Sequence, residues 1–253
     1  MTSIVIIPAR YNSTRFPGKP LYLLRGIPVI QHVYENAQRA RLADDVIVAT
    51  DSETIFERVL AFGGKVVMTD KKHPSGTDRI AEVAASINCD IIVNVQGDEP
   101  LVRPEMIDDV ITILDDERAS IGTLIKKIEN PDEITDPNVV KVVFDKEGFA
   151  LYFSRAPVPY YRDEWKHIAN IRHSAFNMQN CFKHVGIYGY KRNVLLALAG
   201  MEPTKLERIE KLEQLRALEN GMKIKVKETL FETCGVDTPE DIERVEKCLN
   251  TSL

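Results

Sequence analysis

The chain has 253 residues, of which 44% are hydrophobic and 28% are charged, a composition typical of an ordinary soluble globular protein. Its formal net charge is −5, from 33 basic and 38 acidic side chains, which leaves no broad cationic field for binding nucleic acid. No apolar run approaches the ~20 residues that span a bilayer, and the first residues lack a signal-peptide pattern, so we expect a cytoplasmic protein without membrane or nucleic-acid partners.

The first half of the chain alternates between short apolar runs and amphipathic segments. Most of the apolar runs are nearly continuous in Val and Ile, as in strands that are covered on both faces of a parallel sheet. The predicted strands are residues 4–9, 45–50, 65–68 and 90–96, and the predicted helices are residues 28–41, 52–62, 77–87 and 104–114. This alternation predicts an α/β fold with a doubly wound, mostly parallel sheet.

The second half begins with a region, from about 120 to 190, that is rich in Val, Phe and Tyr and punctuated by proline. We expect it to be a β-rich insertion or an extension of the sheet, with a long loop or lid at 162–180. The predicted strands are 139–144, 149–153, 184–190 and 223–228, and the predicted helices are 205–220 and 239–249. The helix at 205–220 is predicted from one apolar stripe, made of Leu206, Ile209, Leu212 and Leu215. We expect residues 1–253 to form a single domain.

Ligands of open parallel sheets bind beyond the carboxyl ends of the strands, so the loops that follow the apolar runs are searched first. The loop after the first predicted strand, residues 8–20, carries Arg10, Arg15 and Lys19, a Pro-Gly turn and no acidic residue. Cations at this edge can neutralise phosphate oxygens. Position and spacing favour a phosphate site over a solvated basic loop, and the loop matches neither the Walker motif nor the dinucleotide glycine motif.

Two aspartates are candidate magnesium ligands. Asp98 follows the fourth predicted strand, where it could hold Mg²⁺ on a phosphate or serve as an ordinary turn residue. In the segment 235–241, Thr238 is a good N-cap and Asp241 completes a capping box, which leaves Asp237 available as a second ligand. An acid just before a helix is also favourable by itself, so both interpretations of Asp237 stay open.

The segment from Ser75 to Arg79 opens the third predicted helix. The N–H groups at a helix start have no partner within the helix, and the small Gly76 allows a ligand to approach them. A plain helix cap at Ser75 explains the same residues equally well.

Seven segments, in chain order, together resemble the 3-deoxy-manno-octulosonate (Kdo) cytidylyltransferase family. They are residues 7–20, 75–77, 94–100, 150–156, 184–190, 212–216 and 235–241. One such motif would be weak evidence, whereas seven in order extend the resemblance over nearly the whole chain. The resemblance implies a homodimeric α/β nucleotidyltransferase that converts CTP and Kdo into CMP-Kdo and pyrophosphate for lipopolysaccharide assembly. It also implies that the β-rich region 120–190 forms the dimer interface and part of the sugar pocket.

The resemblance further implies a role for each site residue. Those expected to bind CTP are Ala9, Arg10, Arg15, Lys19, Ser75, Gly76, Thr77 and Arg79, with Arg10 and Lys19 on the triphosphate. Those expected to bind the sugar acid are Arg15, Gln96, Arg162, His184, Tyr188, Glu213 and Gln214. Asp98 and Asp237 are expected to bind magnesium, of which two ions would clamp the attacking and leaving oxygens. The catalytic set is therefore Arg10, Lys19, Asp98 and Asp237. By contrast, His32 and His73 are expected to have ordinary roles.

Three other functions remain to be weighed. A cytidylyltransferase for another acidic sugar, such as a sialic acid, would share the same chemistry and differ in pocket shape. A nucleotide-sugar glycosyltransferase commonly holds its metal with D-x-D, and no D-x-D occurs in this chain. A non-catalytic nucleotide-binding subunit would be expected to lack Lys19, Asp98 or Asp237, and all three are present.

Overall fold

The computed structural model of the chain describes residues 1–12, 16–162, 165, 178–236 and 238–251. Its main sheet contains β1 (Ser3–Ala9), β4 (Asp45–Thr50), β5 (Val66–Met68), β6 (Ile91–Asn94), β7 (Ile121–Lys127), β8 (Lys141–Phe144), β9 (Ala150–Ser154), β10 (Phe182–Lys191) and β11 (Ile224–Glu228). A separate hairpin is formed by β2 (Leu23–Leu24) and β3 (Ile27–Pro28). The helices are α1 (Val29–Ala37), α2 (Glu53–Ala61), α3 (Gly76–Ser86), α4 (Pro104–Ile113), α5 (Asp132–Thr135), α6 (Arg192–Ala199), α7 (Lys205–Glu210), α8 (Gln214–Glu219) and α9 (Asp241–Thr251).

The strand order across the sheet is β11-β7-β10-β6-β1-β4-β5. Strands β6, β1, β4 and β5 are parallel to one another, and β11 is parallel to β7. Strand β10 runs antiparallel to both β6 and β7, and the β8–β9 hairpin attaches to its first residues. The central sheet is therefore mostly parallel, as predicted.

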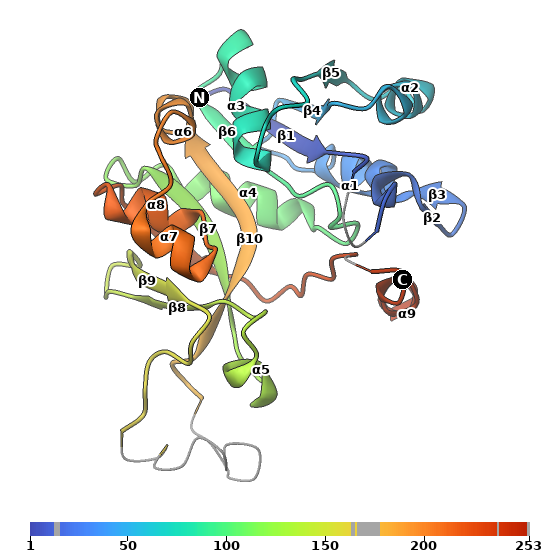
Figure 1. Cartoon of the computed structure of the whole chain (residues 1–253). Coiled ribbons are helices and arrows are strands. Elements are labelled where there is room, and N and C mark those ends of the chain that lie inside the picture. Colours follow the sequence, from blue (N-terminus) through green and yellow to red (C-terminus); the bar gives the residue numbers. More distant parts are fainter. Residues whose placement is uncertain (13–15, 163–164, 166–177, 237, 252–253) are drawn as a thin grey trace.

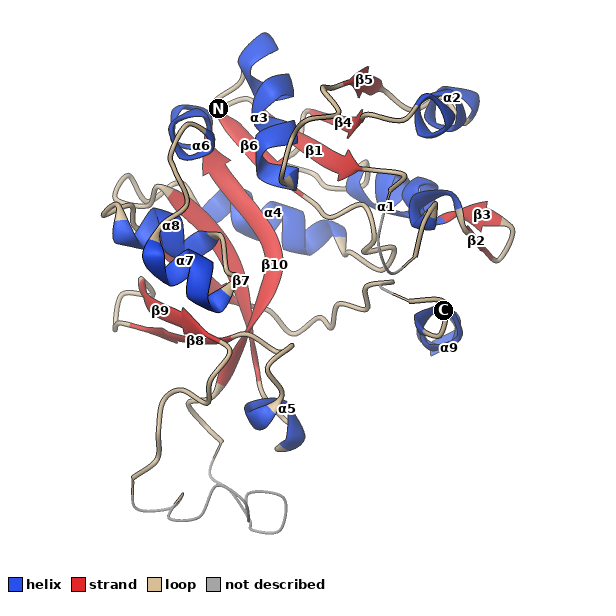
Figure 2. Ribbon diagram, in the orientation of Figure 1, coloured by secondary structure: helices blue, strands red, loops and turns tan. Residues whose placement is uncertain are grey.

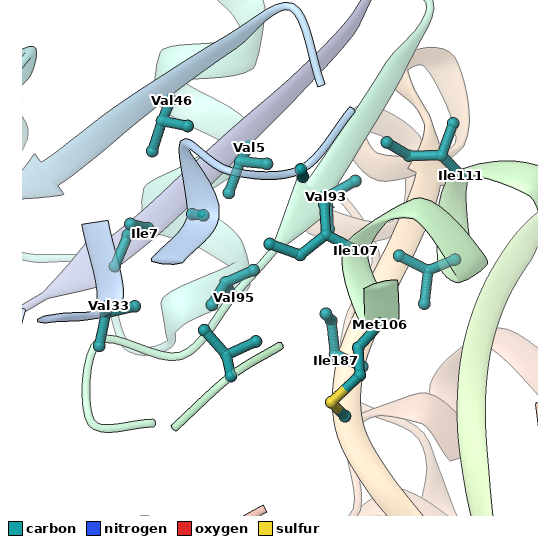
Figure 3. Close-up of a cluster of buried hydrophobic side chains, with 14 of the residues drawn as sticks. Val5, Ile7, Val33, Val46, Val93, Val95, Met106, Ile107, Ile111 and Ile187 are labelled. Carbon is teal, nitrogen blue, oxygen red and sulfur yellow. The ribbon is translucent and has the colours of Figure 1, made fainter. Parts of the chain in front are cut away.

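Helices cover both faces of this sheet (Figure 1), which explains why the central strands β1, β4 and β6 are nearly continuous apolar runs. Alternate residues of β1 face opposite sides, since Val5 and Ile7 pack with α1, α2 and α4 while Ile4 and Ile6 pack with α3, α6 and α8. Figure 3 shows the first of these cores, where side chains of β1, β4 and β6 meet those of α1 and α4. The doubly wound α/β fold is confirmed.

The four strands and four helices predicted in the first half are all present, with somewhat different ends. In the region 120–190, β7 and β10 lie inside the main sheet, and the β8–β9 hairpin and α5 extend from one end of β10 (Figure 2). The sequence does not predict the strands β2, β3 and β7 or the helices α5 and α6. The predicted loop at 162–180 lies mostly outside the described residues. No helix in the described part of the chain is both long and apolar enough to cross a bilayer.

The prediction of one helix over 205–220 is wrong, because the chain breaks between α7 and α8. Lys211 adopts a left-handed conformation with a φ of 54°, which ends α7. The Arg155 guanidinium stabilises this end by donating to the carbonyl of Glu210 at 2.7 Å. Ile209, part of the predicted apolar stripe, is 67% exposed. The break turns the chain so that Glu213 and Gln214 lie against the sheet instead of along one helix face.

Candidate active site

Two adjoining cavities lie at the edge of the sheet where β1 and β6 end. The first encloses about 240 Å³ and the second about 190 Å³, and Gly76 and Gln96 line both. This edge is where open parallel sheets bind ligands, because the loops that follow the strands converge there. The remaining residues of the first cavity are Pro8, Ala9, Arg10, Lys19, Pro20, His73, Pro74, Ser75, Arg79, Gly97 and Asp98.

Lys19 reaches the first cavity from a short 3-10 helix, Lys19–Leu21. The preceding Gly18 has a φ of 72° and donates its N–H to the carbonyl of Tyr11 at 2.9 Å, which closes the loop after β1. The Lys19 ammonium lies 2.5 Å from Asp98 Oδ2, and the Lys19 side chain is 10% exposed. The cavity therefore contains a preformed pair of opposite charges beside the guanidinium-bearing Arg10.

Asp98 is held by close packing of the loop after β6. A Cβ on Gly97 would lie 2.8 Å from the carbonyl oxygen of Pro8, so only glycine lets the loops after β1 and β6 approach this closely. The Asp98 carbonyl accepts a 2.9 Å hydrogen bond from the N–H of Val236. The segment that ends at Val236 is therefore anchored beside Asp98.

The start of α3 forms the wall between the two cavities. Ser75 caps the helix, because its hydroxyl accepts from the Asp78 N–H at 3.1 Å and donates to Asp78 Oδ2 at 2.6 Å. Ser75 and Gly76 also line the first cavity, while Thr77 lines the second. The cap and the contact with the cavity, which the sequence left as alternatives, thus coexist.

Arg79 lies in the same wall, and its guanidinium is hydrogen-bonded to other side chains of the protein. Its side chain is buried and donates to Asp51 Oδ2 at 2.8 Å and to the hydroxyl of Thr69. This arrangement makes Arg79 a rigid, positively charged part of the cavity wall. His73 also lines the cavity and pairs with Glu82, whereas His32 contacts the Leu24 carbonyl away from the site.

The second cavity contrasts with the first because its described walls carry polar groups and aromatic rings but no lysine or arginine. Its other lining residues are Thr77, Asn94, Ile121, Tyr188, Tyr190, Leu198, Glu213 and Gln214. Three buried atoms there, Asn94 Oδ1, Glu213 Oε1 and Gln214 Nε2, have no hydrogen-bond partner among the described residues. Buried polar groups are normally paired, so these three atoms indicate a ligand with several hydrogen-bonding groups.

Burial controls the ionisation of this second region. It raises the pKa of the Glu213 carboxyl and of the Tyr188 hydroxyl, and it lowers the pKa of His184 to about 4. The ring of His184 packs against Tyr188 with centroids 5.2 Å apart, and Tyr188 stacks on Tyr190 at 5.8 Å. Burial thus favours the neutral form of each of these three groups.

Comparison with known proteins agrees with this geometry. The family model for cytidylyltransferases matches residues 4–224. Proteins named 3-deoxy-manno-octulosonate cytidylyltransferase from Thermodesulfovibrio yellowstonii and Geobacter metallireducens are 52% and 54% identical, over 99% of this chain and 99% and 98% of theirs. The chain belongs to this family. It is therefore a nucleotidyltransferase, and the resemblance inferred from the sequence is confirmed.

Solved structures confirm the fold of this Kdo cytidylyltransferase family member. The structure of CMP:2-keto-3-deoxy-manno-octonic acid synthetase complexed with CTP is 40% identical, with a TM-score of 0.90 and full coverage of both chains. A cytidylyltransferase from Leptospira borgpetersenii is 17% identical, with a TM-score of 0.65 over 100% of this chain and 88% of that one, and shares the fold alone.

The structure brings most of the predicted site residues together. Those that line one or both cavities are Ala9, Arg10, Lys19, Ser75, Gly76, Thr77, Arg79, Gln96, Asp98, Tyr188, Glu213 and Gln214. His184 lies beside Tyr188 and Arg162 is exposed, and neither of them lines the two cavities. Arg15 and Asp237 lie outside the described residues, so their roles stay predictions.

Sequence reasoning missed Asn94, Tyr190 and His73. Asn94 is a polar residue at the carboxyl end of an apolar strand, which is a signal that could have identified it. Tyr190 and His73 carry no comparable signal, because Tyr190 reaches the cavity through strand pairing and His73 through the turn before α3. His73 was expected to be ordinary, and instead it lines the first cavity.

The fit of the site to magnesium rests on Asp98. No group of three or more His, Cys, Asp or Glu side chains suited to a metal occurs in the described residues, which leave out residue 237. Mg²⁺ needs only one or two protein carboxylates when substrate phosphates and water supply the other oxygens. The Asp98 side chain is 33% exposed and borders the cationic cavity, so its carboxylate could bind Mg²⁺ together with substrate phosphates.

Proposed function

We propose that the protein transfers the cytidylyl group of CTP to Kdo, giving CMP-Kdo and pyrophosphate. The observation that carries this proposal is the pairing of two different cavities across Gly76 and Gln96. The first offers fixed positive charge for a triphosphate, and the second offers buried hydrogen-bonding groups for a polyhydroxylated molecule. The names of the relatives, each more than 50% identical over nearly the full chain, support CTP and Kdo as the two substrates.

In this proposal the first cavity binds CTP. Arg10 and Lys19 bind the triphosphate, with Arg15 near them, because cations are needed to neutralise its charge. Ala9, Ser75, Gly76 and Arg79 surround the cytosine and ribose, with Thr77 next to them at the boundary with the second cavity. The N-terminal end of α3 adds N–H groups at the boundary where the α-phosphate would meet the second substrate.

The second cavity binds the sugar acid. Glu213, Gln214 and Tyr188 contact its hydroxyl groups, and Gln96 lies where the two substrates meet. His184 binds rather than acting as a general base, because a histidine whose pKa is lowered to about 4 is a weak base at neutral pH. Arg162 and Arg15 are proposed partners of the sugar carboxylate.

The reaction is an in-line displacement in which the anomeric hydroxyl releases its proton to water, its oxygen forms a bond to the α-phosphorus, and the bond from that phosphorus to pyrophosphate breaks. The triphosphate and the sugar carboxylate repel each other, so Arg10 and Lys19 must offset negative charge before the two substrates can meet. Asp98 and Asp237 would hold magnesium, and the anchoring of Val236 on Asp98 supports this pair. Magnesium, as two ions in this scheme, would supply positive charge at the attacking and leaving oxygens.

We also propose a cytoplasmic homodimer whose product serves lipopolysaccharide assembly. The β8–β9 hairpin supports an interface in the region 120–190, since Leu151 on β9 is 63% exposed. Light scattering of the purified protein would measure twice the mass of one chain if the dimer forms.

Pyrophosphate release with CTP and Mg²⁺ tests the function directly. Kdo, a sialic acid and no sugar are compared, with Asp98→Ala in parallel. Release with Kdo alone, lost in the variant, supports the reaction, the substrate and the role of Asp98. Release with the sialic acid instead would keep the chemistry and replace the substrate. No release with any sugar, despite CTP binding, would leave a nucleotide-binding protein without this activity.

A further inference from the structure

Thr123 on β7 has a hydroxyl that is enclosed by β10. The residue is 0% exposed, and its Oγ1 lies 2.7 Å from the carbonyl oxygen of Ile187, 3.3 Å from that of Val185 and 3.0 Å from His184 Nε2. A threonine hydroxyl has one proton to donate and can accept from other donors. Only one of the three neighbouring atoms can therefore accept the Thr123 proton, and the distances indicate which one.

The proton of Thr123 goes to Ile187, because that oxygen is the nearest acceptor. If the proton pointed instead to His184, two oxygens 2.7 Å apart would face each other inside the protein without a hydrogen between them. Thr123 Oγ1 must then accept from His184, which places the proton of the imidazole on Nε2. The other ring nitrogen, Nδ1, is left as a hydrogen-bond acceptor.

We propose that Thr123 is a positioning residue that fixes the Nε2–H tautomer of His184, so that Nδ1 accepts a hydrogen bond from a hydroxyl of the sugar acid. The inference rests on the proposed function in assigning the second cavity and its edge to a sugar. Thr123 itself is enclosed by protein and acts through His184.

The strand pairing shows why the hydroxyl lies where it does. The register between β7 and β10 shifts between Val185 and Tyr188, so that β10 carries extra residues opposite Thr123. The hydrogen bond from Thr123 to Ile187 holds this bulge in place. His184 pairs with Ile125 and Tyr188 pairs with Thr123, so both rings project from one face of the sheet. The bulge thus places the Thr123 hydroxyl within reach of the His184 ring.

The ionisation of His184 is consistent with this role. Its pKa, lowered to about 4 by burial, keeps the ring neutral near pH 7, and a neutral ring has one donor and one acceptor nitrogen. A ring with no fixed donor site would divide its population between two tautomers, and only one of them could accept from the ligand at Nδ1.

The first test is the tautomer itself, measured without any substrate. Protein labelled with ¹⁵N-histidine is compared with His184→Gln, which identifies the His184 signals among those of the five histidines. Long-range ¹H–¹⁵N correlation should show a protonated Nε2 and an unprotonated Nδ1 in the wild type. The Thr123→Val variant should lose this preference, and Thr123→Ser should keep it. A wild-type ring protonated on Nδ1 would overturn the proposal.

The second test is kinetic and uses the sugar acid that the wild type accepts. Thr123→Val should raise the KM for the sugar about tenfold, the effect of one lost hydrogen bond, with little change in the KM for CTP. Thr123→Ser should restore it. In a His184→Ala background, Thr123→Val should add no further increase, because Thr123 acts through His184.

The outcomes separate this inference from the proposed function. If Kdo is not a substrate, the tautomer measurement still decides the role of Thr123 toward His184. If Thr123→Val raises the sugar KM equally with or without His184, Thr123 stabilises the bulge and the proposal fails. If Thr123→Val does not fold, the wild-type tautomer and the Thr123→Ser kinetics decide between the two roles.

Discussion

The two cavities differ in the elements that form their walls and in the charged groups that line them. The first is formed by loops that follow the parallel strands β1 and β6, and it carries fixed charges such as the Lys19–Asp98 pair. The second is formed by the antiparallel strand β10 and by the break between α7 and α8, and three polar atoms of its described residues are buried and unpaired. Each cavity thus suits a different kind of ligand, since a triphosphate is bound by positive charge and a sugar by directed hydrogen bonds.

The charge that lies near the second cavity is kept away from the ligand. The Arg216 guanidinium donates to Glu207 Oε1 at 2.6 Å and to Glu207 Oε2 at 2.9 Å. None of the described residues that line this cavity is a lysine or an arginine. In the proposed function, the carboxylate of the sugar acid therefore points toward the first cavity, whose lining includes Arg10 and Lys19. The division of charge between the cavities thus orients the second substrate.

The largest effect is expected from removing a fixed charge of the first cavity. Lys19→Ala should lower kcat/KM for pyrophosphate release about 10²- to 10³-fold, because the variant loses a cation that faces developing charge. Lys71→Ala is the matched control, since Lys71 is exposed and lines neither cavity. Unchanged turnover in a folded Lys19→Ala protein would contradict the assignment of the first cavity to the triphosphate.

The second cavity can be tested through the stability of the protein at low pH. The folded pKa of His184 is about 4, below the unfolded value of 6.5. As the pH falls below 6.5, the unfolded chain takes up a proton that the folded chain does not. The stability from this group is thus full above pH 6.5 and is lost between pH 6.5 and 4.

Between about pH 7 and pH 4.5, the wild type should therefore lose about 2 to 3 kcal/mol more unfolding free energy than His184→Gln. Urea unfolding of the two proteins at both pH values measures this difference, because other titrating groups are common to both. Equal losses would mean that His184 is solvated rather than buried, and the contrast between the two cavities would weaken.

The contrast between the cavities also explains what could be predicted from sequence. Lys19, Asp98 and Ser75 follow strands or begin a helix that the apolar pattern reveals, so local signals were sufficient to find them. Asn94 and Tyr190 enter the second cavity because β10 pairs antiparallel with β6, and Thr123 contacts His184 because the pairing of β10 with β7 contains a bulge. Pairing partners and register shifts depend on contacts between distant segments, which no local pattern encodes.

The same long-range dependence explains the wrong helix at 205–220. The spacing of its apolar residues indicated one continuous helix, and tertiary contacts replaced it with two. Glu210 at the end of α7 accepts from the Ser154 hydroxyl at 2.8 Å and from the Arg155 N–H at 3.0 Å. These contacts come from β9 and the residue after it, so the break could not be predicted from residues 205–220 alone.

Two glycines allow the packing of the loop after β6 to be compared with that of the bulge in β10. At Gly97, an added methyl group would lie 2.8 Å from the Pro8 carbonyl, so Gly97→Ala should destabilise the protein by about 2 kcal/mol. At Gly186, in the bulge of β10, an added Cβ would meet nothing within 4 Å, and Gly186→Ala should change stability by less than about 0.5 kcal/mol. Urea unfolding of both variants measures the difference. Similar losses would show that the loop after β6 is less tightly packed than its geometry indicates.

The smallest effect is expected at Gln214, where one hydrogen bond to a neutral group is at stake. Its Nε2 is buried and has no partner among the described residues, so Gln214→Ala removes a donor without breaking a contact within the protein. The KM for the sugar should rise about tenfold and the KM for CTP should stay the same, because Gln214 lines the second cavity alone. Gln38→Ala, at an exposed position after α1, is the matched control. A rise in both KM values would mean that the two cavities bind a single substrate, and the separation of charge from directed hydrogen bonding would have to be abandoned.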